Sequence, residues 1–240
     1  MIELITLRAR STILSISSAL KRVTSRKSET FTAVKAFAAS GSVTSLLSGD
    51  ECFEKFDLSY YGSPSETGGF SAYHQMKAVF DLCKNYAENF KPSTVSLLFR
   101  GSPGVGKTYL SACIARVVAG KGYSVCYDTA ASALEAFELR KFARDPETAE
   151  TAGVKVRRML DCDLMILDDL GTEMTTYISI SALYTLINTR LLTGKPTIIS
   201  TNLLDDELEK RYSPQICSRI QGEYSTLQFA GADARRRNKG

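Results

Sequence analysis

Short apolar runs alternate along the chain with longer stretches in which apolar residues recur every three or four positions. The short runs predict strands at residues 95–99, 124–128, 163–169, 197–200 and 225–229, of which 95–99 and 197–200 are expected to be buried. The helical spacing predicts helices at residues 72–89, 109–119, 177–192, 205–212 and 214–221, and two more within 130–158 that are separated near Asp145 and Pro146. Strands that are apolar throughout are covered on both faces. The alternation therefore predicts an α/β domain with a parallel sheet, whose active residues follow the carboxyl ends of the strands.

A glycine-rich turn joins the first predicted strand to the next helix. It reads Gly101, Ser102, Pro103, Gly104, Val105, Gly106, Lys107 and Thr108, which fits the phosphate-binding pattern G-x-x-x-x-G-K-[ST]. Its glycines let the backbone approach a ligand closely, and the exposed N–H groups form a nest for an anion. We expect Lys107 to bind the β- and γ-phosphates, Thr108 to bind Mg²⁺, and Tyr109 to complete the nucleotide site. The pattern predicts an ATP site rather than a plain glycine-rich turn.

Two acidic residues end the third predicted strand. Asp168 is placed to hold Mg²⁺ directly or through water, and Asp169 can polarise the water that attacks the γ-phosphate. Taken alone, two adjacent carboxylates could equally form a solvated loop. Their position after an apolar strand, downstream of a phosphate loop, favours the second ATPase motif, Walker B. Many ATPases of this kind carry Glu in the second place, so the shorter Asp169 is compatible with slow hydrolysis.

The fourth predicted strand is followed by a neutral amide, Asn202. An amide at this place can orient the attacking water or contact the γ-phosphate. The alternative interpretation is that Asn202 caps the helix that begins near Asp205. The residues alone leave both interpretations open.

Composition limits the class of protein. The chain has 240 residues, of which 44% are hydrophobic, so it can bury a substantial core. A net charge of +4 permits a nucleic-acid partner without requiring one. The sequence holds no apolar run long enough to span a membrane, and we expect a soluble cytoplasmic protein with no membrane partner. The six cysteines form no C-x-x-C pair and are predicted to be reduced and buried, and the single histidine, His74, gives little support for a zinc site or a Ser-His-Asp triad.

The first fifty residues differ from the rest. They are rich in Ser and Thr, contain several Arg and Lys residues and few acids, and make a poor signal peptide. We interpret residues 1–50 as a mobile or weakly helical basic arm; an organelle transit peptide and a small partner-binding helix around 31–39 are the alternatives. The predicted organisation continues with a linker and amphipathic helix at 51–94, an ATPase core at 95–235 and a basic tail at 236–240.

With these residues placed, the chain resembles the DnaC-type helicase loaders of bacteria and phages, which are AAA+ ATPases grouped with the transposition helper IstB. The matching segments are residues 53–61 (FEKFDLSYY), 101–108, 167–173 (LDDLGTE), 200–202 (STN), 207–212 (ELEKRY), 216–220 (ICSRI) and 231–235 (GADAR). Only the phosphate loop is specific by itself, whereas the set as a whole is specific to the family.

The resemblance implies a five-stranded sheet in the order 5-1-4-3-2, a small or absent helical lid, and sites for ATP and Mg²⁺ shared between neighbouring subunits of a spiral. It implies that Asn202 is sensor 1 and that Arg219 is an arginine finger acting on the neighbour's ATP. Arg235 matches a sensor 2 arginine, although Ala234 stands before it where an aromatic residue is usual.

The leading functional hypothesis is an ATPase that assembles into an ATP-dependent oligomer and loads a replicative hexameric helicase on single-stranded DNA. One alternative is an IstB-like regulator that assembles on duplex DNA and stimulates a transposase, and another is a nucleotide-dependent binding module with negligible turnover. Many loaders carry a helicase-binding domain with zinc-binding cysteines before the core, but residues 1–50 contain no cysteine. The helicase contact is therefore made by an unrelated arm or is missing.

The predicted helices within 130–158 are where this family lines its single-strand path. Basic residues there supply positive charge, although charges on a helix are commonly just a solvated face: Arg140, Lys141, Arg144, Lys155, Arg157 and Arg158.

Overall fold

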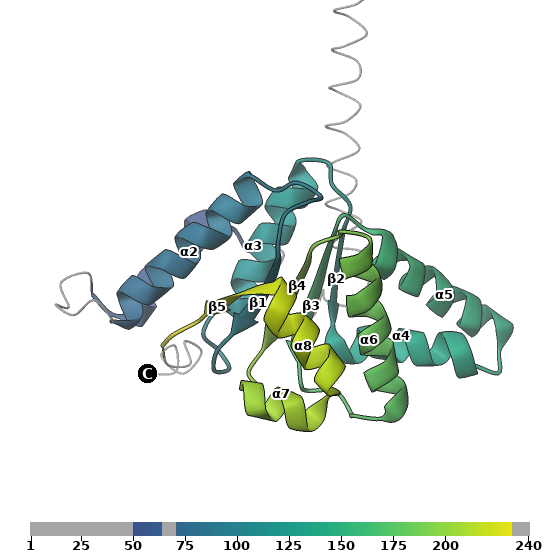
Figure 1. Ribbon diagram of the computed structural model, residues 1–240. Coiled ribbons are helices and arrows are strands. Elements are labelled where there is room, and N and C mark those ends of the chain that lie inside the picture. The colour runs from purple at the N-terminus through teal and green to yellow at the C-terminus, as the bar shows by residue number, and fades with distance from the viewer. Residues whose placement is uncertain (1–49, 64–70, 232–240) are drawn as a thin grey trace, which may run out of the picture.

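The computed structural model describes residues 50–63 and 71–231 of the chain. Residues 1–49 of the predicted basic arm, the predicted tail at 236–240 and Arg235 lie outside this part. The described residues form a parallel five-stranded sheet in the order β2-β3-β4-β1-β5, with helices on both faces (Figure 1). Read from the opposite edge, this order is 5-1-4-3-2. The predicted α/β fold and its strand order are therefore confirmed.

Every predicted strand and helix is present, with ends that differ by at most a few residues. The strands are β1 (Ser96–Arg100), β2 (Val125–Thr129), β3 (Leu164–Leu170), β4 (Thr197–Thr201) and β5 (Tyr224–Gln228). The α-helices are α2 (Ala72–Glu88), α3 (Lys107–Gly120), α4 (Ala130–Phe142), α5 (Pro146–Asp161), α6 (Tyr177–Leu192), α7 (Asp205–Arg211) and α8 (Pro214–Glu223). Two 3₁₀ helices, η1 (Phe53–Lys55) and η2 (Leu58–Tyr61), precede them and were not predicted.

The break between α4 and α5 has a local cause. Asp145 is the residue before α5, and its side chain accepts a hydrogen bond from the Thr148 backbone N–H at 2.9 Å. Pro146 occupies the first turn, where its missing N–H would have no partner in the helix. The carboxylate and the proline together start a new helix here, as the sequence predicts.

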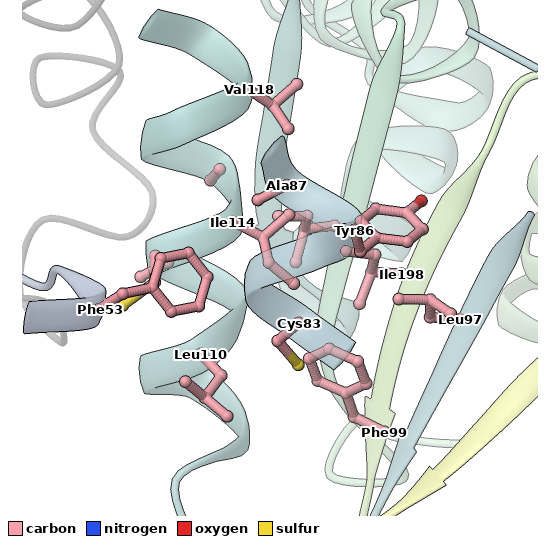
Figure 2. Packing of buried hydrophobic residues seen from close by; sticks show 14 of the residues in the cluster. Phe53, Cys83, Tyr86, Ala87, Leu97, Phe99, Leu110, Ile114, Val118 and Ile198 are labelled. Carbon is pink, nitrogen blue, oxygen red and sulfur yellow. The ribbon is translucent and has the colours of Figure 1, made fainter. Parts of the chain in front are cut away.

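Alternate residues of the central strands point to opposite faces of the sheet. Leu97 and Ile198 pack with α2 and α3, whereas Leu98 and Ile199 pack with helices α4 to α8. Figure 2 shows the first of these cores, in which Cys83, Tyr86 and Ala87 of α2 and Phe53 of η1 gather with residues of α3 and the strands. Because both faces are covered at the centre of the sheet, β1, β3 and β4 are almost wholly buried, whereas the edge strand β5 is mostly exposed.

A buried arginine ties the second core to the sheet. Arg190 of α6 is fully buried, and its guanidinium donates to the Thr197 hydroxyl at 2.9 Å and to the carbonyls of Met159 and Pro196 at 2.8 and 2.7 Å. These acceptors compensate for the loss of hydration that burial imposes. The side chain therefore fastens α6 to β4 and to the end of α5.

The six cysteines are free thiols, as predicted, and all but Cys52 are buried. Burial raises the pKa of the Cys113 thiol to about 12, so this group stays protonated at neutral pH. Within residues 50–63 and 71–231, none of the helices has the length and apolar character needed to cross a bilayer.

Candidate nucleotide site

The glycine-rich turn closes tightly between β1 and α3. Gly106 has a φ of 90°, a left-handed conformation that side chains disfavour. A Cβ atom at this position would lie 2.8 Å from the hydroxyl of Tyr61 and 3.2 Å from the ring of Phe56. Glycine is thus required here both by the backbone and by the residues packed against it.

The lysine and threonine of the turn stand at the start of α3. The Lys107 ammonium donates to the carbonyls of Gly101 at 2.7 Å and Ser102 at 2.9 Å, so its charge lies over the turn itself. Lys107 is buried, and Thr108 is half-buried beside it. The N-terminus of a helix and a cation placed together favour an anion such as a phosphate.

A β-bulge turns Asp169, the second of the two acids, toward this site. Leu167 of β3 pairs with Ile199 of β4, but Leu170 pairs with Thr201, so β3 contains one extra residue at the acids. Asp169 takes a φ of 55°, which is uncommon for a residue with a side chain, and its N–H donates to the Ser200 hydroxyl at 2.9 Å. Strained conformations of this kind cluster at functional sites.

Asp168 is 2% exposed and accepts hydrogen bonds from both neighbouring strands. The Tyr127 hydroxyl of β2 donates to its Oδ2 at 2.8 Å, and the Ser200 hydroxyl of β4 donates to its Oδ1. Burial, followed by the charge of Asp168, raises the pKa of Tyr127 well above 10, so the phenol remains a donor at neutral pH. Neither hydroxyl was predicted from the sequence, because each belongs to another strand.

One pocket of about 500 Å³ joins these elements. Its lining includes Lys107, Thr108 and Tyr109 from the start of α3, together with Asp169 and Asn202 from the ends of β3 and β4. Asn202 does not cap the following helix, because Leu204 is the residue before α7 and its N–H is bound by Glu207 at 2.7 Å. The alternative interpretation of Asn202 as a cap is therefore wrong. The predicted residues Pro103, Gly104 and Gly106 also line the pocket.

A further part of the pocket lining comes from the segment before α2, to which the sequence assigned no role in the site. Phe56 lies 5.9 Å from the Tyr61 ring and 5.6 Å from the Tyr109 ring, measured between centroids. The Tyr61 hydroxyl donates to the Val105 carbonyl at 3.1 Å, and burial raises the pKa of Tyr61 to about 12. The run of aromatic residues in 53–61 was the available signal, but its partners lie far along the chain.

Glu173 shapes the turn that follows the acid pair. This carboxylate is 6% exposed and accepts from the Gly171 N–H at 2.9 Å and from the Tyr212 hydroxyl. Two of the segments that carried the resemblance, 167–173 and 207–212, therefore meet in space. These hydrogen bonds compensate for the burial of Glu173, which lies outside the pocket, so the residue needs no chemical role to account for its burial.

Arg219 lies away from the pocket of its own chain. It belongs to α8, which packs with α6 on the sheet face opposite to α3 (Figure 1). Its guanidinium carbon is 5.4 Å from the centre of the Tyr184 ring, and one nitrogen donates to the Tyr184 hydroxyl at 3.2 Å. Arg235, the predicted sensor 2 residue, lies outside the described residues.

The basic residues of α4 and α5 divide into two kinds. Arg140, Lys141, Arg144, Arg157 and Arg158 are exposed. Lys155 instead forms an ion pair with the buried Asp128, at 2.6 Å, and donates to the Ser132 hydroxyl at 2.7 Å. The Lys155 ammonium therefore serves the packing of α5 on β2.

Comparison with known families decides the relationship. The family described as IstB-like ATP binding protein matches residues 76–215, more than half of the chain. The chain belongs to this family. The match covers the phosphate loop, the acid pair and Asn202, so the ATP-binding core of the family is the part built around the pocket.

Relatives of known role are more distant. The replicative helicase loader DnaC of Escherichia coli K12 is 24% identical over 151 residues, which cover 61% of this chain and 58% of DnaC. The replicative helicase loader DnaI of Bacillus subtilis 168 is 29% identical over 162 residues, which cover 67% of this chain and 47% of DnaI. A crystal structure of the DnaC helicase loader matches with a TM-score of 0.56 and 23% identity, over 65% of this chain and 90% of that structure. The chain thus spans about half the length of the curated relatives it matches.

The donors at the site suit magnesium better than a metal held by protein alone. Within the described part of the chain, no three His, Cys, Asp or Glu residues gather as a metal cluster. Mg²⁺ is commonly held by one or two carboxylates together with the phosphates of a nucleotide. Asp168 and Thr108 fit that requirement, because each offers an oxygen ligand. The two residues also lie near each other, since the Tyr127 hydroxyl is 2.8 Å from Oδ2 of Asp168 and 3.5 Å from the backbone carbonyl oxygen of Thr108.

Gly106→Ala tests whether the turn has the geometry described. The added methyl group meets the Tyr61 hydroxyl and a left-handed backbone, so we expect a loss of about 1–3 kcal/mol in unfolding free energy and a loss of nucleotide affinity. Gly120→Ala is the matched control, because its Cβ meets nothing within 4 Å and it ends the same helix. Urea unfolding and nucleotide titration measure both variants; a Gly106→Ala chain that matches the control would contradict this geometry.

Proposed function

We propose that this chain is an ATPase that loads a replicative helicase on single-stranded DNA. The observation that carries the proposal is the convergence of Lys107, Asp169 and Asn202 on one pocket in a chain of the IstB-like family. The likeness to DnaC and DnaI supports helicase loading rather than another use of ATP. Loading, assembly and DNA binding are all part of the proposal.

In this proposal different residues of the chain bind different parts of the nucleotide. The N–H groups of the turn and the Lys107 ammonium bind the β- and γ-phosphates, and the aromatic wall of Phe56 and Tyr109 faces the base. Thr108 and Asp168 hold Mg²⁺, which when bound offsets negative charge on the phosphates. The segment that carries Phe56 is fastened to the turn through Tyr61, so both ends of the nucleotide are held by one packed unit.

Hydrolysis requires a water molecule placed in line with the γ-phosphate. Asp169 accepts the proton of that water and Asn202 orients it, because both side chains line the pocket beside Lys107. The bulge in β3 directs Asp169 toward the water while Asp168 stays buried. An aspartate reaches less far than a glutamate, so turnover is slow unless the neighbouring subunit closes the site.

Asp169→Asn separates binding from turnover. The amide keeps the shape of the carboxylate but accepts no proton, so we expect ATP affinity within about threefold of the parent and turnover lower by about 10²-fold or more. Lys107→Ala is the companion variant and should lose affinity itself by about tenfold or more, because a charge-assisted contact is removed. Fluorescence titration with Mg²⁺ and a phosphate-release assay measure the two quantities. Parent-like turnover in Asp169→Asn would remove Asp169 from the mechanism.

Arg219 acts, in this proposal, on the ATP of a neighbouring subunit. The sheet separates α8 from α3, so this guanidinium is remote from the turn of its own chain. A guanidinium supplied by a neighbour stabilises the charge that develops on the transferred phosphoryl group. The ring of Tyr184 supports the side chain at the surface until the neighbour arrives.

A mixing experiment tests this assignment. Arg219→Ala should bind ATP normally and hydrolyse it slower by on the order of 10³-fold, as for other arginine fingers. Mixing it with Lys107→Ala should restore part of the activity, because some interfaces then combine an intact Lys107 with an intact Arg219. Lys210→Ala, at an exposed position of the preceding helix, is the control partner and should behave as parent in the assay. No recovery on mixing, from two folded variants, would contradict a role in trans.

The single-strand path, in this proposal, runs along α4 and α5. Their exposed cations accompany Phe142, an aromatic residue that is 52% exposed at the end of α4. Cations that follow the backbone and aromatic rings that stack on bases are the usual means of binding single strands without sequence preference. Lys155 is excluded from this set because it is paired with Asp128.

Reversing Arg157 and Arg158 to Glu tests the path. If both residues contact phosphates, the slope of log affinity against log salt should flatten by about 1.4 for single-stranded DNA. Lys84→Glu with Lys91→Glu is the control, since it makes the same charge change in α2 and in the turn after it, on the opposite face of the sheet. Equal slopes in the two double variants would place the path elsewhere.

The IstB-like regulator remains the second candidate, because the matching family is named for IstB. Co-purification with a hexameric helicase distinguishes a loader, whereas ATP-dependent assembly on duplex DNA distinguishes a transposition helper. ATP binding without DNA-stimulated turnover would favour the binding module.

A further inference from the structure

Tyr127 lies between the two residues assigned to Mg²⁺. Its ring belongs to the core on the α3 face of the sheet and is 5% exposed. Its hydroxyl donates to Oδ2 of Asp168 at 2.8 Å and stands 3.5 Å from the carbonyl oxygen of Thr108. A buried tyrosine hydroxyl usually has a hydrogen-bond partner, and here the acceptor at 2.8 Å is the carboxylate assigned to Mg²⁺.

The sheet register explains this position. β2 and β3 are parallel, and Thr129 pairs with Asp168. Tyr127 stands two residues before Thr129 and so shares its face, which makes Asp168 its diagonal neighbour. The Tyr127 side chain is long enough for its hydroxyl to reach the Asp168 carboxylate along this diagonal.

The second oxygen of Asp168 is held from the other side. Ser200 of β4 donates to Oδ1 and accepts from the Asp169 N–H. A carboxylate has about four positions at which it can accept a hydrogen bond or bind a cation. Two hydroxyls therefore set the plane and position of the group while leaving lone pairs for a cation.

We propose that Tyr127 is a positioning residue for the magnesium-dependent part of nucleotide binding, acting through Asp168. This inference rests on the proposed role of Asp168 and Thr108 in holding Mg²⁺. The Tyr127 hydroxyl fixes the carboxylate relative to the start of α3, so that a cation on the phosphates meets it without rearrangement. Partners that orient a metal ligand in this way typically change metal affinity by about 10–100-fold.

Tyr127→Phe is the test, because it removes one oxygen and keeps the ring. The affinity of the full chain for a fluorescent, slowly hydrolysed ATP analogue is measured with saturating Mg²⁺ and with a chelator, and the ratio gives the enhancement due to Mg²⁺. We expect this ratio to fall by about tenfold or more, while affinity in the chelator stays within about twofold. Thermal melting without nucleotide shows that the variant is folded.

Tyr86→Phe is the matched control. Tyr86 is also buried on this face, but its hydroxyl donates to the Val95 carbonyl at 3.0 Å, before β1 begins. Removal of the Tyr86 hydroxyl should leave the ratio of affinities with and without Mg²⁺ unchanged. An unaltered ratio in Tyr127→Phe, or an equal loss with and without Mg²⁺, would overturn the proposal in favour of a packing role.

A double-mutant cycle shows whether Tyr127 acts through Asp168. Asp168→Asn should reduce the ratio by itself, and adding Tyr127→Phe should then cost little more. Full additivity would contradict the proposal. A parent chain whose affinity does not respond to Mg²⁺ would instead overturn the proposed metal role of Asp168, and this inference with it.

Discussion

The burial of one negative charge links the sheet to its chemistry. Asp168 is almost fully buried at the end of β3, and a carboxylate out of water requires hydrogen-bond donors. Those donors come from Tyr127 on β2 and Ser200 on β4, the two strands that flank β3. The arrangement depends on strand order and on register, since a shift by one residue would turn each hydroxyl to the other face.

The bulge beside this carboxylate separates the tasks of two adjacent acids. Without the extra residue, Asp168 and Asp169 would simply alternate across the strand. With it, Asp168 remains in the sheet while Asp169 turns into the pocket in a left-handed conformation. Ser200 serves both residues, because one hydroxyl donates to the first and accepts from the backbone of the second.

The pocket also depends on residues far from it in sequence. Tyr61 packs against Gly106 and against Gly231, where a Cβ atom would lie 2.8 Å from its ring. The segment before α2, the phosphate turn and the residues just after β5 are thus in mutual contact. Aromatic rings fill this junction because they bury a large area while their hydroxyls find carbonyl partners.

Local patterns in the sequence were enough to place the elements and to predict the chemistry of the turn. Apolar runs and helical spacing report on one segment at a time, which is enough to place the acids at the end of β3 and α3 after the turn. The phosphate pattern is likewise local, since its glycines, Lys107 and Thr108 are contiguous. The helix break at Asp145 and Pro146 can likewise be predicted from local sequence, because a capping residue and a proline act within one turn of helix.

Which groups meet across the sheet depends instead on how the elements pack together. The hydroxyl of Tyr127 reaches Asp168, Lys155 pairs with Asp128, and Arg219 rests on Tyr184. Each contact joins residues on different elements, so it depends on strand order, register and helix packing rather than on any local pattern. Periodicity tells which face of a strand is apolar, but it carries no information about which distant side chain will lie opposite.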